Sequence, residues 1–174
     1  MFVLLPPVLA ALALQFLAHP TLTSSSILPR AQYCSNAPNV VAGSTFTHRL
    51  LLPRGNPIRQ YWCAPNSRTY IVFSRVVPVG GSVIFRLLVN FNAHLDRVLP
   101  GRENRLLPGG GFSWGEDQLY SVQISNANNH QCTFGVMRSA VAALTDFMTT
   151  ENTYGTMSFE IWDGENEVGL GVVG

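Results

Sequence analysis

The chain has 174 residues, among them eleven arginines, no lysine and ten acidic residues, and its net charge is +1. Ten arginines and two acids precede Leu107, whereas one arginine and eight acids follow it. The basic half carries no nucleic-acid-binding motif and no interleaved aromatic residues, which argues against a nucleic-acid partner. The separation of charge instead indicates that the two halves pack against each other, with an anionic partner as the alternative.

The N-terminal residues have the character of a secretory signal peptide. The run from Phe2 to Ala18 has no charged residue and only one polar residue, Gln15. It is shorter than the roughly 20 apolar residues of a membrane span, and two prolines interrupt it. A buried N-terminal helix is the alternative, but the flanking residues lack capping and amphipathic signals. The predicted segments are a signal peptide at 1–18, a propeptide or linker at 19–30 and a single mature domain at 31–174.

Three cysteines, Cys34, Cys63 and Cys132, lie in the predicted mature domain. In an oxidising compartment one pair is expected to close and one thiol to remain. A bridge between Cys34 and Cys63 would tie the weakly patterned N-terminal arm to the core. Chain-entropy arguments give such a loop about 3 to 4 kcal/mol of stabilisation.

The first half of the mature domain predicts strands followed by a helix. A strand is possible at Thr45–Leu52. The segment "IRQYWCAPNSRTYIVFSRVV" indicates two strands joined by a turn, the second at Thr69–Val77. Apolar residues then recur at helical spacing over Val83–Leu99, with Ser82 as the N-cap and Pro100 after the end. His94 falls close to the apolar stripe of this helix, where a histidine is usually a packed group at the edge of the core.

The second half predicts one more helix between strands. "LLPGGGFSWGED" is expected to be a loop, and its glycines lack the Gly-Lys-Ser/Thr of a phosphate-binding loop. A strand at Leu119–Ser125 precedes an amphipathic helix at Thr133–Thr150. The C-terminal residues alternate as two strands around a "DGEN" turn. The expected fold is an α+β two-layer domain, a mostly antiparallel sheet with two amphipathic helices on one face.

The stretch "NNHQCTFGV" places His130 and Cys132 at the start of the second helix. A thiol at a helix N-terminus beside a histidine has a lowered pKa, the arrangement of papain-like hydrolases. Those enzymes also need a histidine on a later strand, and no histidine follows His130. The alternative is a buried thiol at the helix start, with asparagines bonding to turn amides.

A glycosidase remains an open alternative, since it needs only two suitably spaced carboxylates. Glu160 is the main candidate, and tryptophans nearby would suit sugar stacking. Surface acids and half-buried tryptophans are nevertheless common in proteins of every class. The acidic residues of the "DGEN" region do not fit the spacing of a calcium-binding EF-hand, so no metal site is expected. The other carboxylates considered are Glu116, Asp117 and Asp163, and the tryptophans are Trp114 and Trp162.

The segments "NANNHQCTFGVMRSAVAALTDFM" and "YGTMSFEIWDGENEVGLG" resemble the C-terminal half of small secreted fungal proteins of unknown function. The resemblance covers the last third of the chain strongly and Tyr70–Leu99 weakly. It implies secretion and an α+β domain, and it assigns no activity. In that family the position of Cys132 is often threonine or another residue, which argues against a catalytic thiol. A looser likeness to killer-toxin-like effectors concerns the fold alone.

Together these observations predict a secreted, non-enzymatic protein that acts through its surface. We expect an extracellular partner, such as a glycan or a host or cell-wall component, and no membrane association after signal cleavage. No cofactor is expected. One alternative is a small carbohydrate-active or cysteine hydrolase, and another is a cell-wall or surface-structural component with no discrete ligand. The residues expected to contact a ligand are Asn128, Asn129, His130, Gln131 and Asp163.

Overall fold

The computed structural model describes residues 32–45, 59–79, 82–117 and 119–174, with the side chains of 116 and 117 left out. All of them belong to one unit, residues 31–174, which coincides with the predicted mature domain. The predicted signal peptide and linker lie outside the described residues. So does nearly all of the predicted strand at Thr45–Leu52, and Thr45 itself is not in a strand.

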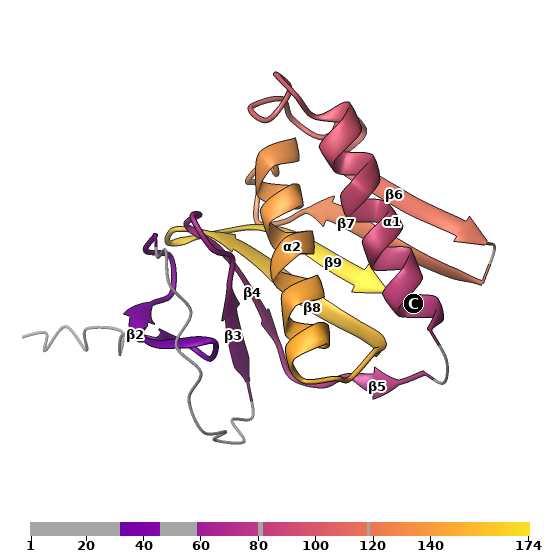
Figure 1. The fold of residues 1–174 in the computed structure, drawn as a ribbon. Coiled ribbons are helices and arrows are strands. Elements are labelled where there is room, and N and C mark those ends of the chain that lie inside the picture. The colour runs from indigo at the N-terminus through magenta and orange to yellow at the C-terminus, as the bar shows by residue number, and fades with distance from the viewer. Residues whose placement is uncertain (1–31, 46–58, 80–81, 118) are drawn as a thin grey trace, which may run out of the picture. The chain divides into compact units, whose positions relative to one another are not determined.

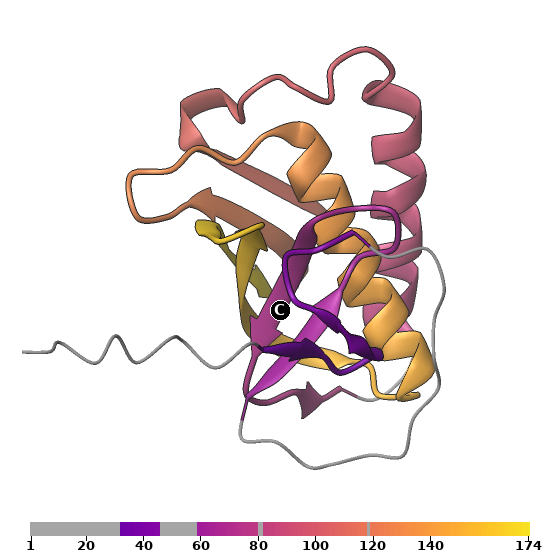
Figure 2. The same ribbon diagram turned by 90° about the vertical axis from the view of Figure 1, so that its left-hand side faces the viewer.

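An antiparallel sheet of seven strands forms the centre of this unit, and two helices, α1 (Val83–Val98) and α2 (Phe134–Thr150), cover one face of it (Figures 1 and 2). The short β5 pairs with β8 beside the end of β4. This arrangement confirms the predicted α+β fold. In sheet order the strands are β3 (Gln60–Cys63), β4 (Thr69–Phe73), β8 (Gly155–Asp163), β9 (Asn166–Val173), β7 (Tyr120–Asn126) and β6 (Gly111–Asp117), with β5 (Val77–Pro78) beside β8.

Both helices follow the apolar periodicity of the sequence. The buried side chains of α1 recur three or four residues apart, from Ile84 to Leu95, so they form one stripe that faces the sheet. Helix α2 buries seven side chains, among them Leu144 and Met148. Ser82 is the N-cap residue of α1, as predicted, but its side chain makes no capping hydrogen bond. No helix in the described parts of the chain is both long and apolar enough to cross a membrane.

The inner face of the sheet, which faces the helices, accommodates large side chains of β8 next to glycines of β9. Phe159 and Ile161 are fully buried and lie opposite Gly171 and Gly169. A Cβ atom at Gly171 would lie 2.2 Å from the Phe159 ring, well inside van der Waals contact. The glycine therefore leaves the space that the phenylalanine fills.

The outer face of the sheet is covered at one end by a hairpin of β1 (Tyr33–Cys34) and β2 (Ala37–Val41). The Cys34–Cys63 disulfide joins this hairpin to β3, with 5.6 Å between the Cα atoms. The predicted bridge is thereby confirmed. Tyr70 and Val72 of β4 are buried beneath the hairpin.

The free edge of β3 is closed by the turn between β1 and β2. The Ser35 amide donates to the Tyr61 carbonyl at 2.6 Å, and the Ser35 hydroxyl accepts from the Tyr61 amide at 3.3 Å. The buried Asn36 side chain donates to the Cys63 carbonyl at 2.9 Å and accepts from the Cys63 amide at 3.1 Å. Two residues thus satisfy the backbone groups that an edge strand usually leaves open.

Two details of the strand prediction were wrong. Residues 111–117 form β6, although they fall within the predicted loop "LLPGGGFSWGED". The loop continues only to a short 3₁₀ turn at Pro108–Gly110. The strand predicted at Thr69–Val77 ends at Phe73, and Val77 begins β5. In both places pairing with a neighbouring strand, β7 or β8, decides the structure rather than local propensity.

We predict that Gly171→Ala destabilises the domain by about 1 to 3 kcal/mol, because the new methyl group overlaps the Phe159 ring. Urea denaturation measures the change. Adding Phe159→Leu to Gly171→Ala should cost less than the sum of the two single substitutions, since the smaller side chain leaves room for the methyl group. Strictly additive costs would contradict a steric origin.

Candidate functional site

Residues 127–130 form a tight turn between β7 and α2. Asn128 and Asn129 have φ values of 51° and 59°, in the left-handed region that asparagine tolerates better than most residues. The His130 amide donates to the Ala127 carbonyl at 2.9 Å and closes the turn. The side chains of residues 128–131 are exposed. The predicted polar cluster therefore exists as an accessible turn.

The amides at the start of α2 are already bonded within the protein. The Phe134 amide donates to the Arg105 carbonyl at 2.9 Å, and the Gly135 amide donates to the Glu103 carbonyl at 2.8 Å. The next amide donates to the Thr133 hydroxyl at 3.3 Å. The segment between α1 and β6, together with the Thr133 side chain, thus occupies the groups that would otherwise bind an anion at a helix N-terminus.

Of the two alternatives for Cys132, an activated nucleophile or a buried thiol at the start of the helix, the structure has the buried thiol. Its side chain has no exposed surface, and its amide donates to the Asn126 Oδ1 atom at 2.9 Å. Burial raises the pKa of the thiol to about 12, and the negative charge of Asp163 adds to this increase. His130 is exposed, and among the described residues no hydrogen bond joins its ring to Cys132. These facts oppose an activated nucleophile.

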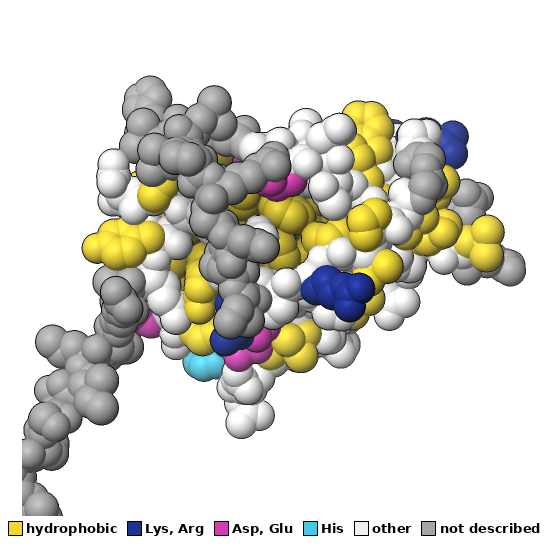
Figure 3. All heavy atoms as spheres, turned by 90° about the horizontal axis from the view of Figure 1, so that it is seen from below, with side chains coloured by type: hydrophobic (Ala, Val, Ile, Leu, Met, Phe, Trp, Pro, Cys, Tyr) yellow, Lys and Arg dark blue, Asp and Glu magenta, His cyan; other side chains and the backbone are white. Residues whose placement is uncertain are grey.

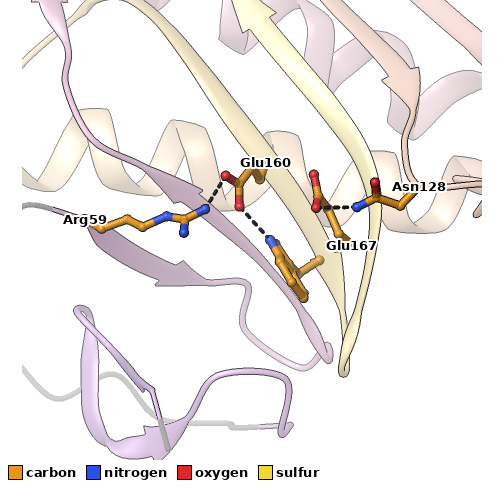
Figure 4. Close-up of polar contacts among 5 residues, drawn as sticks. Arg59, Asn128, Glu160 and Glu167 are labelled. Carbon is orange, nitrogen blue, oxygen red and sulfur yellow. Dashed lines mark hydrogen bonds and ion pairs between the residues drawn. The ribbon is translucent and has the colours of Figure 1, made fainter. Parts of the chain in front are cut away.

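Glu160 lies on the outer face of the sheet in a network with Arg59 and Trp162 (Figure 4). Its Oε1 atom forms an ion pair with the Arg59 guanidinium. Its Oε2 atom accepts a hydrogen bond from Trp162 Nε1 at 3.0 Å. Trp162 in turn stacks on Tyr70, with 6.0 Å between ring centroids. Both oxygens of the carboxylate are therefore held in fixed positions.

A β-bulge brings the polar turn and the C-terminal hairpin together. Ile161 pairs with Gly169 and Trp162 pairs with Glu167, so Val168 is an extra residue in β9. Glu167 thereby lies beside Trp162 and accepts a hydrogen bond from Asn128 Nδ2 at 2.6 Å (Figure 4). The predicted ligand-contacting turn is thus joined directly to the hairpin that carries Asp163.

Of the other residues considered for a glycosidase, Asp163 and Trp114 do not join Glu160 in one site. Asp163 is three residues from Glu160 on one strand, and alternation directs the two side chains to opposite faces. Trp114 packs on the inner face, where its ring stacks on Phe91 at 5.7 Å and on His94 at 4.1 Å. His94 is thus a packed residue at the edge of the core, as predicted. The side chains of Glu116 and Asp117 lie outside the described residues.

An open groove of about 750 Å³ crosses the outer face over β4, β8 and β9. Arg59 and Glu160 line one part of it, and Val77 of β5 lines another. A second hollow continues over β9, β7 and β6 and shares Leu170 and Val172 with the first. Seen from below, the side of β5, hydrophobic side chains gather near the middle, with charged side chains beside them (Figure 3).

Leu170 and Val172 are the site residues that sequence reasoning missed. Each has 47% of its surface exposed, although both are aliphatic residues within a strand. Their alternation with Gly169, Gly171 and Val173 is the signal that places them on the outer face. Among the described residues, no group of three or more acidic, histidine or cysteine side chains is placed to hold a metal ion.

Comparisons of the chain with protein-family models, with curated proteins and with solved structures found no match. The resemblance to small secreted fungal proteins therefore stays a prediction. The class that the structure itself defines is a disulfide-containing α+β domain with a partly open sheet face.

We predict that Cys132 makes stability fall above pH 9. The unfolded thiol ionises near its ordinary value of 9.0, whereas the folded thiol stays protonated up to about pH 12. The unfolded state therefore loses a proton first, and the free energy of unfolding falls by about 1 kcal/mol between pH 9 and 10. Cys132→Ala should lack this decline, as measured by urea denaturation at both pH values. Tyr70, whose pKa burial raises from 10.0 to about 12, affects stability mainly at higher pH.

Alkylation gives an independent check of the same thiol. Iodoacetamide should modify Cys132 of the folded protein at pH 7.5 only at the rate of unfolding, and rapidly once the protein is denatured. Fast modification of the folded protein would contradict a buried, protonated thiol.

Proposed function

We propose that the protein is a secreted fungal binding protein without enzymatic activity, acting at the surface of a host, a competitor or a cell wall through the outer face of its sheet. The uncharged N-terminal run supports secretion, because it has the composition of a signal peptide. The Cys34–Cys63 bridge supports it independently, since such bonds persist mainly in oxidising compartments.

The exposure of Leu170 and Val172 in the groove is the observation that carries the binding role. Two large aliphatic side chains, each 47% exposed, lie side by side on the part of β9 beyond the bulge, bordered by polar residues. Contiguous apolar surface with a polar rim is typical of interaction sites. The groove of about 750 Å³ is also within the size range of ligand sites.

The alternative, a small hydrolase, has less support. A cysteine hydrolase needs an accessible thiolate, and the Cys132 thiol is buried with a raised pKa. A glycosidase needs a second carboxylate facing the first across the scissile bond. Glu160 instead has Arg59 on one oxygen and Trp162 on the other.

The proposed contact surface continues from the groove to the turn at 128–131. Asn128 bonds to Glu167 on β9, whose outer face also carries Leu170 and Val172. One partner that covers the groove therefore also reaches the turn and the tip of the hairpin, where Asp163 lies with its side chain directed away from the groove. Such a surface spans several strands and needs no single deep pocket.

We predict that Leu170→Arg abolishes binding of the purified, fluorescently labelled protein to its target among intact fungal walls, bacterial cells and plant epidermal cells. A large cation in the middle of the groove removes apolar contact and adds a desolvation cost. Val89→Arg is the matched control, because Val89 is 41% exposed but lies on α1, across the inner face from the groove.

Equal loss of binding in both variants would show a general effect of charge, and unchanged binding in both would place the interaction elsewhere. The combination of alanine at Asn129, His130 and Asp163 tests the turn and hairpin separately. Unchanged binding in that variant would remove them from the contact surface.

A further inference from the structure

The open part of the outer face is rich in hydroxyl and amide groups. Neighbouring strands present these side chains in rows, because cross-strand partners point to the same side of a sheet, as Ser113 and Gln123 do. The exposed members with neutral polar side chains are Ser113 on β6, Gln123 and Ser125 on β7, and Ser158 on β8. This surface offers donors and acceptors without charge.

Two of the three charged side chains that line the groove cancel. Arg59 and Glu160 form an ion pair in which the side chains remain 47% and 28% exposed, so both groups can still contact a ligand. Their pair presents guanidinium donors next to carboxylate acceptors, which matches a group that donates and accepts at once, as a hydroxyl does. Arg75 lies in the exposed segment between β4 and β5, toward one end of the groove.

Leu170 and Val172 supply an apolar strip between these polar groups. A ligand that fits must combine apolar patches with many hydroxyl groups and carry little charge. A pyranose ring has this character, with C–H groups on its faces and hydroxyls around its rim. A strongly apolar ligand would leave the hydroxyl and amide groups of these strands without hydrogen-bond partners, and an anionic ligand would not match the carboxylate of the ion pair.

We infer that the outer face binds a neutral glycan chain that runs across the strands, from the end of β4 at Phe73, which lines the groove, over β8, β9 and β7 to β6. Neighbouring strands are about 4.8 Å apart, which is close to the repeat of an extended β-linked glycan, so successive sugars would meet successive strands. This inference rests on the proposed function and names the ligand class of the same surface.

The experiment measures retention of the purified protein on insoluble chitin, cellulose and β-1,3-glucan at 50 mM and 500 mM NaCl. The wild-type protein should be retained by at least one of them, equally at both salt concentrations, because a neutral ligand gives no ionic contact to screen. Glu160→Gln and Arg59→Gln should each weaken binding of the matching oligosaccharide at least tenfold by calorimetry, since each removes a charged hydrogen-bonding group.

The matched control is the ion pair of Arg138 with Asp96, in which a guanidinium nitrogen lies 2.5 Å from Oδ1 of Asp96. The two residues belong to the two helices, on the opposite side of the sheet. Asp96→Asn and Arg138→Gln should bind the oligosaccharide as the wild-type protein does. Equal weakening in Glu160→Gln and Asp96→Asn would overturn the inference, and so would retention that is lost at 500 mM NaCl.

The inference and the proposed function fail in different ways. Absence of retention on every neutral polysaccharide, while Leu170→Arg still abolishes cell-surface binding, would overturn the glycan ligand alone. The absence of any difference between wild-type and Leu170→Arg protein on intact cell surfaces would overturn the binding face itself, and the glycan ligand with it.

Discussion

The one-sided covering of the sheet is the constraint on which the rest of the domain depends. Helices α1 and α2 bury the inner face, where Phe159 fills the space left by Gly171. Among the described residues the outer face has no such layer of helices, so each part of it must be compatible with water or be covered by something else. Its two ends meet this requirement in different ways.

At the β3 end a hairpin covers the outer face, and at the β6 end the strands themselves are polar there. Tyr70 and Val72 lie under the hairpin that Cys34 holds in place. Ser113 and Gln123 meet the solvent directly. Leu170 and Val172 lie between these two regions, and they are neither covered by the hairpin nor polar. Their exposure is therefore a local exception to the pattern of the face, which is why it points to binding.

Much of the fold could be predicted from the sequence, because its helices and C-terminal strands have strong periodic patterns. The bounds of α1 and α2 agree with the apolar spacing to within a residue. Strand β6 could not be found this way, since its glycines indicate a loop and only pairing with β7 makes it a strand. The disulfide followed from the count of cysteines and their positions.

The candidate site was less accessible to sequence reasoning, because its contacts join distant segments. Arg59 and Glu160 are 101 residues apart, and Asn128 and Glu167 are 39 apart. The exposed turn at 128–131 was expected. The sequence left open whether the Cys132 thiol is activated or buried. The segment between α1 and β6 packs over the start of α2 and buries the thiol. No pattern within "NNHQCTFGV" contains that information.

The turn at Ser35 and Asn36 has a consequence for self-assembly. Because its side chains and backbone occupy the outer hydrogen-bonding groups of β3, another chain cannot add a strand there. Within the described residues β6 pairs only with β7, so the opposite end of the sheet offers a row of free strand-pairing groups. Assembly by strand addition at the ends of this sheet would then stop once the β6 edges of two molecules had paired. A closed pair of molecules joined through β6 is compatible with this geometry, whereas an open-ended fibre that uses both ends of this sheet is not.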